Sequence, residues 1–210
     1  MADSQGAPVP SLHLRRWQVE AVPLALSALE QKKNGVIVAT TGAGKSIALA
    51  EMLRRWRETH PVDEGKIVVT TPSKKLVEQL AGTFASILGA HNVGRYYTKA
   101  KQWQRPIIVC CNPSVPTLAV MLKEHGQPVS LWIADECHKT ATDNMRALVV
   151  EGDGAEEDES NAVGAKVIAD ALGADRRLGF TATPFRSKES ETLELFSEVI
   201  YWYPPADALR

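Results

Sequence analysis

The residues Ala39–Ser46, which read ATTGAGKS, combine two glycines, a lysine and a hydroxyl directly after an apolar run. Gly42 and Gly44 allow the backbone to curl so that several N–H groups point at phosphate oxygens, and a following helix adds its positive N-terminal end. In such a loop Lys45 reaches the β- and γ-phosphates, and Ser46 offers its hydroxyl to Mg²⁺. The pattern predicts a nucleotide site formed by Thr41, Gly42, Ala43, Gly44, Lys45 and Ser46.

Two adjacent carboxylates, Asp135 and Glu136, follow the apolar run Leu131–Ala134. If that run is a strand of an α/β sheet, they emerge at its C-terminal end, where such sheets bind ligands. One carboxylate then holds the metal that bridges the phosphates, and the other orients and deprotonates an attacking water. We assign Asp135 to the metal and Glu136 to the base; an acidic pair that merely caps a helix is the alternative.

Short β-rich runs alternate with longer helical patterns, which predicts an α/β fold: a mostly parallel sheet with helices on both faces. The expected strands read as continuous apolar runs, as strands buried on both faces do; they are 35–39, 66–71, 107–111, 131–134, 177–181 and 199–202. Apolar residues at three- and four-residue spacing predict the helices, which are 46–60, 73–88, 114–124 and 162–172. Gly173 stands where the last helix would end.

Size and composition fit one globular unit, since the chain has 210 residues, of which 44% are hydrophobic and 23% are charged. No run approaches the roughly 18 apolar residues of a membrane helix, so we expect an intracellular, cytoplasmic protein without a membrane partner. Cys110, Cys111 and Cys137 are expected to be small buried hydrophobes in a reduced protein, not ligands of a zinc site.

The net charge of −1 hides a division along the chain. Residues 1–139 hold 17 Lys and Arg against 11 Asp and Glu, whereas residues 140–210 hold 7 against 14. Such an asymmetry is itself a signal of a charged partner for one half. The acidic run Glu151–Glu159 has no apolar periodicity and is expected to be a solvated loop, with a regulatory or partner-binding role as the alternative.

Three strings in order, ATTGAGKS, then DECH at 135–138, then TATP at 181–184, resemble the first motor domain of superfamily-two helicases and translocases. The resemblance covers residues 13–205 and implies a RecA-like P-loop domain with ATP bound at one edge of the sheet. It implies that Lys45 and Glu136 are catalytic, and that Arg15 and Gln18, in a segment whose glutamine recognises adenine, also bind ATP. It further implies that His138 couples ATP hydrolysis to nucleic-acid binding through Thr181 and Thr183; a histidine that caps a helix is the alternative.

Two further segments resemble the family's nucleic-acid motifs, and their matching residues are Pro72, Lys74, Lys75, Gln79, Ser114 and Thr117. A solvated first helical turn is the alternative for the two lysines. Trp17 and Trp132 are expected to pack in the core, whereas Trp103 either stacks on a base or stands exposed. The TATP and LRxxQ spellings resemble DNA-acting members, such as restriction motors and repair translocases, more than RNA-directed ones, so DNA is favoured over RNA. Such a protein would associate with the nucleoid in a bacterium or phage.

The expected domain map has a flexible arm at 1–12 and a first RecA-like domain at 13–205, with an acidic loop insertion at 151–161. Motors of this family pair two RecA-like domains, the second of which supplies an arginine finger. We expect that second domain to be absent from these 210 residues and to join in cis or in trans, so that the chain alone hydrolyses ATP weakly. The rival functions are a P-loop kinase for a small molecule and a non-catalytic module that binds nucleic acid or protein.

Overall fold

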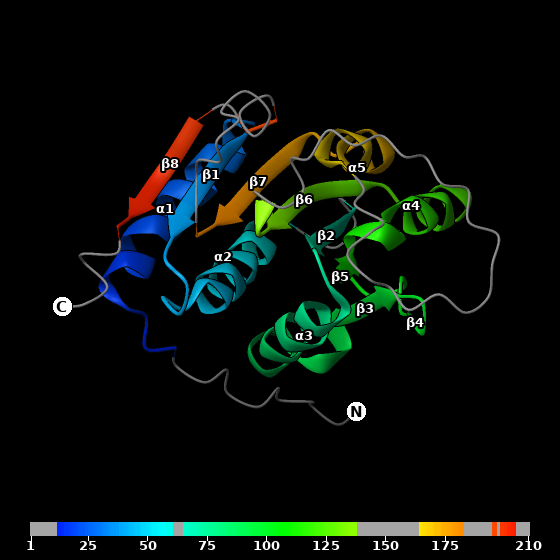
Figure 1. The fold of residues 1–210 in the computed structure, drawn as a ribbon, viewed down its shortest axis with the longest axis horizontal. Coiled ribbons are helices and arrows are strands. Elements are labelled where there is room, and N and C mark those ends of the chain that lie inside the picture. The colour runs from blue at the N-terminus through cyan, green and yellow to red at the C-terminus, as the bar shows by residue number, and fades with distance from the viewer. Residues whose placement is uncertain (1–11, 61–64, 138–163, 183–194, 197, 205–210) are drawn as a thin grey trace, which may run out of the picture.

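One sheet of eight strands forms the centre of the computed structural model, which describes residues 12–60, 65–137, 164–182, 195–196 and 198–204. The spatial order of the strands is β4-β3-β5-β2-β6-β7-β1-β8, and every neighbouring pair is parallel except β3 with β4 (Figure 1). The strands are β1 Gly35–Ala39, β2 Lys66–Thr71, β3 Val93–Tyr97, β4 Ala100–Lys101, β5 Ile107–Cys111, β6 Val129–Asp135, β7 Arg176–Thr181 and β8 Glu198–Tyr203.

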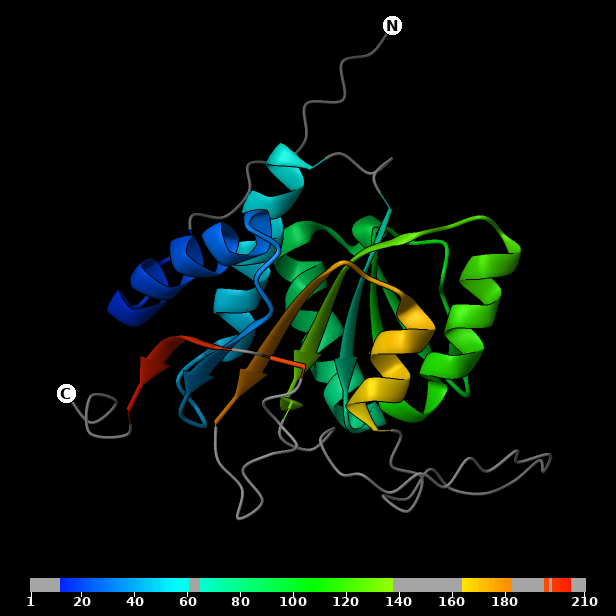
Figure 2. The same ribbon diagram turned by 90° about the horizontal axis from the view of Figure 1, so that it is seen from above.

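Helices cover both faces of the sheet, as Figure 2 shows with α1 and α2 in blue and cyan on one side and α4 and α5 in green and yellow on the other. The helices are α1 Arg16–Glu30, α2 Lys45–Thr59, α3 Lys74–Leu88, α4 Val115–Glu124 and α5 Ala165–Leu172. Successive strand residues point to opposite faces, so Ile37 packs in the core under α1, α2 and α3, and Val36 and Val38 pack in the core under α4 and α5. The expected α/β class and mostly parallel sheet are therefore confirmed.

All six expected strands are present, with bounds that differ by at most two residues where they differ at all. The four expected helices are also present; the last begins at Ala165, and residues 162–163 lie outside the described part. It ends at Gly173, whose φ of 59° is the left-handed conformation that glycine adopts most easily. The cysteines Cys110, Cys111 and Cys137 are buried, as expected of small hydrophobes.

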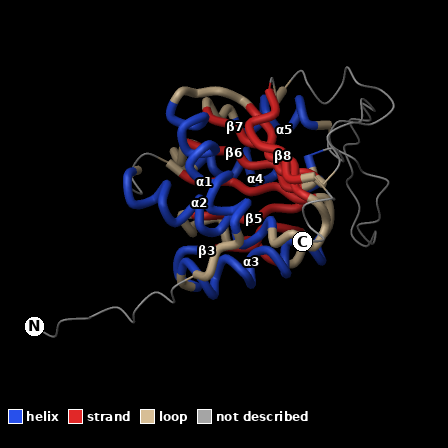
Figure 3. Tube along the Cα trace, turned by 90° about the vertical axis from the view of Figure 1, so that its left-hand side faces the viewer, coloured by secondary structure: helices blue, strands red, loops and turns tan. Residues whose placement is uncertain are grey.

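Three elements were not expected from the sequence, namely α1, β3 and β4. Helix α1 contains Pro23 and buries mainly alanines between its larger apolar residues, which weakens the periodic signal. Gly94 and Arg95 interrupt the apolar run of β3, and β4 is only two residues long. Figure 3 looks onto the β8 edge of the sheet, where Trp17 of α1 stacks on Tyr203 of β8 with ring centroids 5.5 Å apart.

No helix in the described segments is long and apolar enough to cross a membrane. The expected arm at 1–12 and the acidic run 151–159 lie outside the described residues, apart from Leu12.

Candidate active site

The loop between β1 and α2 has the backbone that a phosphate cradle needs. Gly42 and Gly44 have φ of 78° and 89°, a region that residues with a side chain rarely adopt. Gly44 is also the N-cap of α2, whose amide groups at Ile47 and Ala48 donate to its carbonyl. The free amides of the first turn therefore face the loop, where the helix dipole favours an anion. Lys45 and Ser46 begin this helix, so their side chains start at its positive end.

Side chains at the start of α1 donate hydrogen bonds to the backbone carbonyl groups of this loop. The guanidinium of Arg15 donates to the carbonyls of Gly42 and Ala43 at 3.3 and 3.1 Å, and the indole N–H of Trp17 donates to Ala43 at 3.1 Å. The amide of Gln18 donates to the carbonyl of Gly44 at 2.9 Å and accepts from the backbone N–H of Arg15 at 2.7 Å. Arg15 and Gln18 thus lie against the phosphate loop, and adenine recognition by Gln18 stays a prediction.

Gly44 has a second role in this contact. A Cβ atom at this position would lie 2.9 Å from Nε2 of Gln18. Any side chain here would therefore push the glutamine away from the loop, in addition to straining the backbone.

Glu136 of the acidic pair forms an ion pair with Lys45 of the phosphate loop. Nζ of Lys45 lies 3.1 Å from Oε1 of Glu136, and 3.4 Å from the carbonyl oxygen of Ala39. Both charged side chains are largely buried, with exposed fractions of 12% for Lys45 and 22% for Glu136. The chain brings these two residues together because β6, which ends at Asp135, is separated from β1 only by β7.

Two features show that the positions of Asp135 and Glu136 are unfavourable for the free energy of folding. Burial and the Glu136 carboxylate raise the pKa of Asp135 to about 6, and Lys45 acts in the opposite direction. Glu136 has a φ of 51°, a left-handed conformation that costs a residue with a side chain on the order of 1 kcal/mol. Crowded carboxylates and local strain are features that cluster at functional sites.

The residues present fit a magnesium ion. Mg²⁺ prefers oxygen ligands and usually takes only one or two protein groups, with water and phosphate oxygens completing its shell. The Asp135 carboxylate and the Ser46 hydroxyl are oxygen donors of this kind, and a cation would offset the burial and the repulsion by Glu136 that raise the pKa of Asp135.

Thr181 lies at the end of β7, between the phosphate loop, which follows β1, and the acidic pair, which follows β6. It pairs with Val38 of β1, and its neighbour Phe180 pairs with Asp135 of β6. Its side chain is buried, with 1% of the residue exposed. His138 and Thr183, the other two residues expected to couple hydrolysis to nucleic-acid binding, lie outside the described residues.

The residues expected to touch nucleic acid lie at the same edge, beyond β2 and β5. Lys74, Lys75 and Gln79 are exposed on the first turns of α3, after Pro72. Ser114 is buried and Thr117 is exposed, with the Thr117 hydroxyl donating to the Ser114 carbonyl at 2.9 Å. The structure places all six residues at the C-terminal ends of two neighbouring strands.

Two polar residues at these strand ends were missed from the sequence. The hydroxyl oxygen of Thr71 and Oδ1 of Asn112 are buried without a hydrogen-bond partner in the described structure. A buried polar atom without a partner is unfavourable, and a ligand that supplies one would remove the penalty. Asn112 stands in the NPSVPTL segment, so its place in that motif was the available signal.

Two of the tryptophans considered in the sequence lie in the core, and a third is partly exposed. Trp17 and Trp132 are buried, and the Trp132 indole donates to the Thr70 hydroxyl at 2.9 Å, so the expectation that both pack in the core is confirmed. Trp103 is half-buried against His125, with ring centroids 4.2 Å apart. Trp103 is therefore not fully exposed, and stacking on a base stays a prediction.

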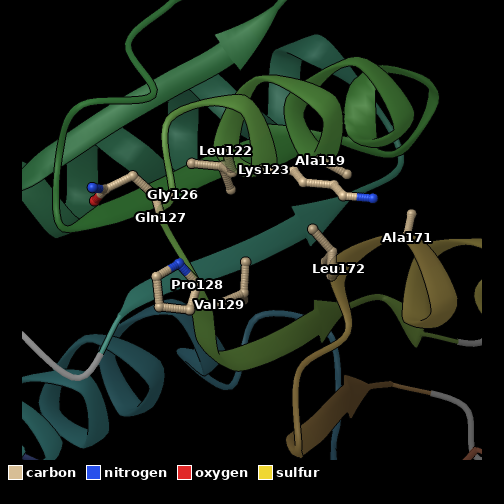
Figure 4. Close-up of a pocket in the computed structure, with 9 residues that line it drawn as sticks. All are labelled: Ala119, Leu122, Lys123, Gly126, Gln127, Pro128, Val129, Ala171 and Leu172. Carbon is tan, nitrogen blue, oxygen red and sulfur yellow. The ribbon is translucent and has the colours of Figure 1, made fainter.

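A pocket elsewhere in the molecule contains none of these residues. It lies between the ends of α4 and α5 and the start of β6, and is lined by residues such as Leu122, Val129 and Leu172 (Figure 4). Because β6 begins here and ends at Asp135, this pocket lies at the opposite end of the sheet from the phosphate loop.

A family comparison agrees with this geometry. Residues 11–186 match the family described as the type III restriction enzyme, res subunit. The chain belongs to this family. Its fold is that of the RecA-like motor domain of superfamily-two helicases, as the structural neighbours also show.

Similar proteins of known sequence include both restriction enzymes and RNA helicases. The ATP-dependent RNA helicase DHX58 of Mus musculus is 33% identical over 147 residues, which are 64% of this chain and 21% of the relative. A type I restriction enzyme endonuclease subunit, SsaAORF53P of Staphylococcus saprophyticus, is 24% identical over 212 residues, covering 94% of this chain and 20% of the relative. The chain thus spans about a fifth of the length of these relatives.

Solved structures share the fold at low sequence identity. The type ISP restriction-modification enzyme LlaBIII bound to DNA has a TM-score of 0.69 at 15% identity, covering 94% of this chain and 16% of that one. The UvsW helicase of bacteriophage T4 has a TM-score of 0.59 at 17% identity, covering 90% of this chain and 60% of that one.

Proposed function

We propose that this chain is the ATP-binding half of a nucleic-acid translocase or helicase. On this proposal it hydrolyses ATP and, together with a second RecA-like domain, couples hydrolysis to tracking along or separating strands. The observation that carries the proposal is the convergence of Lys45 and Glu136, 3.1 Å apart, from the ends of two different strands. A small-molecule kinase and a binding module have no equal need of this pair together with Asp135 and Ser46.

On this proposal, each side chain of the site has its own role in ATP hydrolysis. Lys45 neutralises the β- and γ-phosphates, and Ser46 and Asp135 would hold Mg²⁺, which would supply positive charge to the same phosphates. Glu136 accepts the proton of the attacking water. Thr181, with His138 and Thr183, links the phosphate site to the nucleic-acid edge of the sheet.

The ion pair between Lys45 and Glu136 gives this scheme an order. Lys45 cannot stay at Glu136 and also reach the phosphates of a bound nucleotide, so ATP draws the ammonium away. Glu136 is then no longer paired with Lys45, and its carboxylate is left to accept the proton of the attacking water. The base is therefore released from the ion pair only when the phosphate site is occupied.

DNA is the favoured track. Two observations support it: the TATP and LRxxQ spellings in the sequence, and structural neighbours described as bound to DNA. The similarity to an RNA helicase favours RNA as a second candidate. ATPase rates measured with single-stranded DNA, duplex DNA and single-stranded RNA of the same length distinguish the two.

The carboxylates provide the decisive test of the mechanism. In a protein that joins this chain to its second RecA-like domain, Glu136→Gln is expected to bind Mg·ATP normally and to lose hydrolysis by about 10²–10⁴-fold, because the amide cannot accept a proton. Asp135→Asn is expected to raise the Mg²⁺ concentration needed for half-maximal binding. Glu58→Gln, an exposed site on α2, is the control and should change neither quantity. Parental hydrolysis in both active-site variants would refute the assignment.

A further inference from the structure

The β3–β4 hairpin lies on the same edge of the sheet as the active site. Because β3 is parallel to β5, and β5 to β2, the C-terminal ends of all three strands lie along one edge. The turn between Tyr97 and Ala100 therefore continues the row of strand ends that begins at the phosphate loop. Figure 1 shows β3 and β4 at the far end of that row, near α3 and α4.

Side-chain contacts join the hairpin to both segments expected to bind nucleic acid. On one face of the sheet, Nζ of Lys74 lies over the Tyr97 ring, 5.2 Å from its centroid. On the other face, the side chains of Tyr96 and Thr117 are hydrogen-bonded, and Nζ of Lys101 lies over the Tyr96 ring at 4.4 Å. The hairpin thus lies between the start of α3 and the start of α4.

The hairpin carries a positive charge that its surroundings leave uncompensated. Residues 93–105 contain Arg95, Lys99, Lys101 and Arg105 and no acidic residue. Lys99 and Lys101 are exposed, as are Lys74 and Lys75, and within the described residues none of the four lysines forms an ion pair.

Among the described residues, the carboxylate that contacts this region, Glu78, is already engaged. Glu78 pairs with Arg95 at 2.9 Å and accepts a hydrogen bond from the Tyr97 hydroxyl at 2.5 Å. The exposed lysines must therefore find their counter-charge outside the described structure.

The hairpin is also held firmly in place. The backbone N–H of Gln102 donates to the Arg95 carbonyl at 3.0 Å, and the Gln102 side chain accepts from the Arg95 N–H at 3.1 Å. Arg105 donates to the His91 carbonyl at 3.0 Å. A fixed backbone orders the charges before a ligand arrives, which lowers the entropic cost of binding.

We propose that the β3–β4 hairpin is a nucleic-acid contact, in which Lys99 and Lys101 bind backbone phosphates and extend the track beyond the start of α3. This inference rests on the proposed function, since it assigns a further part of the same nucleic-acid face. Lysines at a sheet edge also serve to prevent edge-to-edge association of strands, and the test must separate that role from phosphate binding.

The test compares Lys99→Ala/Lys101→Ala with Lys32→Ala/Lys123→Ala in the 210-residue chain. The control pair also removes two positive charges. Its lysines are exposed at the ends of α1 and α4, near the N-terminal ends of the strands and away from the phosphate loop. Binding of a labelled oligothymidylate and of an oligouridylate of equal length is measured by fluorescence anisotropy over a range of salt concentrations. Melting temperature with and without Mg·ATP shows that each variant folds and keeps its nucleotide site.

The hairpin variant should bind on the order of tenfold more weakly at low salt, and the slope of log affinity against log salt should fall by about 1.4, since each phosphate contact with a single strand contributes about 0.7. The control should bind as the parent does. The DNA and RNA arms should change together if the lysines read phosphate alone.

Two outcomes would overturn the inference. One is an unchanged salt slope in the hairpin variant, and the other is unchanged affinity accompanied by self-association in size-exclusion chromatography, which would assign the lysines to edge protection. If the parent chain binds neither oligonucleotide at low salt, the proposed function fails, and that result is distinct from both.

Discussion

At the scale of single residues, the active site pairs its lysine with one of its own carboxylates. Lys45 pairs with Glu136, and Arg15 and Gln18 occupy the carbonyls of the phosphate loop. The proposed chemistry needs Lys45 at the phosphates. Nucleotide binding therefore exchanges the Glu136 partner of Lys45 for phosphate oxygens.

Lys45→Ala should abolish stabilisation by Mg·ATP, because the lysine is the cation of the described structure that lies between the phosphate loop and the acidic pair. At about 100 times its Kd, ATP should stabilise the parent by about 2.7 kcal/mol and the variant by nothing measurable. Without nucleotide, the variant should lose about 1 kcal/mol, since Glu136 loses its partner. Differential scanning fluorimetry with and without Mg·ATP measures both.

Lys32→Ala is the control. The Lys32 side chain is 56% exposed and lies before the start of β1, at the other end of that strand from the phosphate loop, so this variant should keep the full nucleotide response. A parental response in Lys45→Ala would refute the phosphate-loop assignment.

At the scale of elements, α2 carries a buried carboxylate that has no role in the proposed chemistry. Glu51, with a side chain only 5% exposed, accepts from Nε of Arg54 at 2.8 Å and from Nε of Arg55 at 2.7 Å. These hydrogen bonds outweigh burial and hold the pKa of Glu51 below its ordinary value of 4.5. Both ion pairs are made within α2, the helix that follows the phosphate loop, and they stabilise that helix.

Glu51→Gln should lower the free energy of unfolding by about 1–2 kcal/mol at neutral pH, because the two arginines lose their counter-charge while remaining partly exposed to water. A carboxyl group with a lowered folded-state pKa stabilises the protein fully above pH 4.5, and this contribution disappears as the pH falls through the folded-state value. The difference between parent and variant should therefore shrink below pH 4.5. Urea denaturation at neutral and acidic pH measures it.

Glu58→Gln removes an exposed partner of Arg54 and is the matched control, with an expected change of less than about 0.5 kcal/mol. A gap between parent and Glu51→Gln that stays constant down to acidic pH would show that the carboxylate charge is not what stabilises the helix.

The elements also show what the sequence could reveal. Strands β1, β2 and β5 were predicted with their observed bounds, because strands buried on both faces leave unbroken apolar runs. The order of the strands leaves no such mark, so the contact of Lys45 with Glu136 could be expected only through a family resemblance. The hydrogen bonds from Arg15, Trp17 and Gln18 to the loop join residues far apart in the chain, and no local pattern indicates them.

At the scale of the whole molecule, nucleotide and nucleic-acid residues share one edge of the sheet. The phosphate loop follows β1, the acidic pair follows β6, and the proposed nucleic-acid residues follow β2, β5 and β3. A second RecA-like domain placed along this edge would touch both sets at once. We therefore expect the two activities to rise together when that domain is joined.

The corresponding prediction compares this chain with a protein in which it is joined to its second RecA-like domain. The chain alone should bind ATP and turn it over slowly, because an arginine supplied by a partner is worth about 10³–10⁵ in rate in related phosphoryl-transfer enzymes. The joined protein should show faster turnover that saturates with DNA. Steady-state ATPase assays against DNA concentration measure both. Full DNA-stimulated turnover by the 210-residue chain would contradict the need for a second domain.

The position of β1 has a consequence for how the protein is made. Strand β1 is synthesised early, but its two neighbours in the sheet, β7 and β8, are the last strands of the described chain to leave the ribosome. Until β7 has emerged, the strand that leads into the phosphate loop has no partner on either side. Pairings between segments so distant in sequence form slowly. The nucleotide site therefore forms only after β7 has paired with β1 and β6, so the first appearance of ATP binding in a nascent or refolding chain would report that this central pairing is in place.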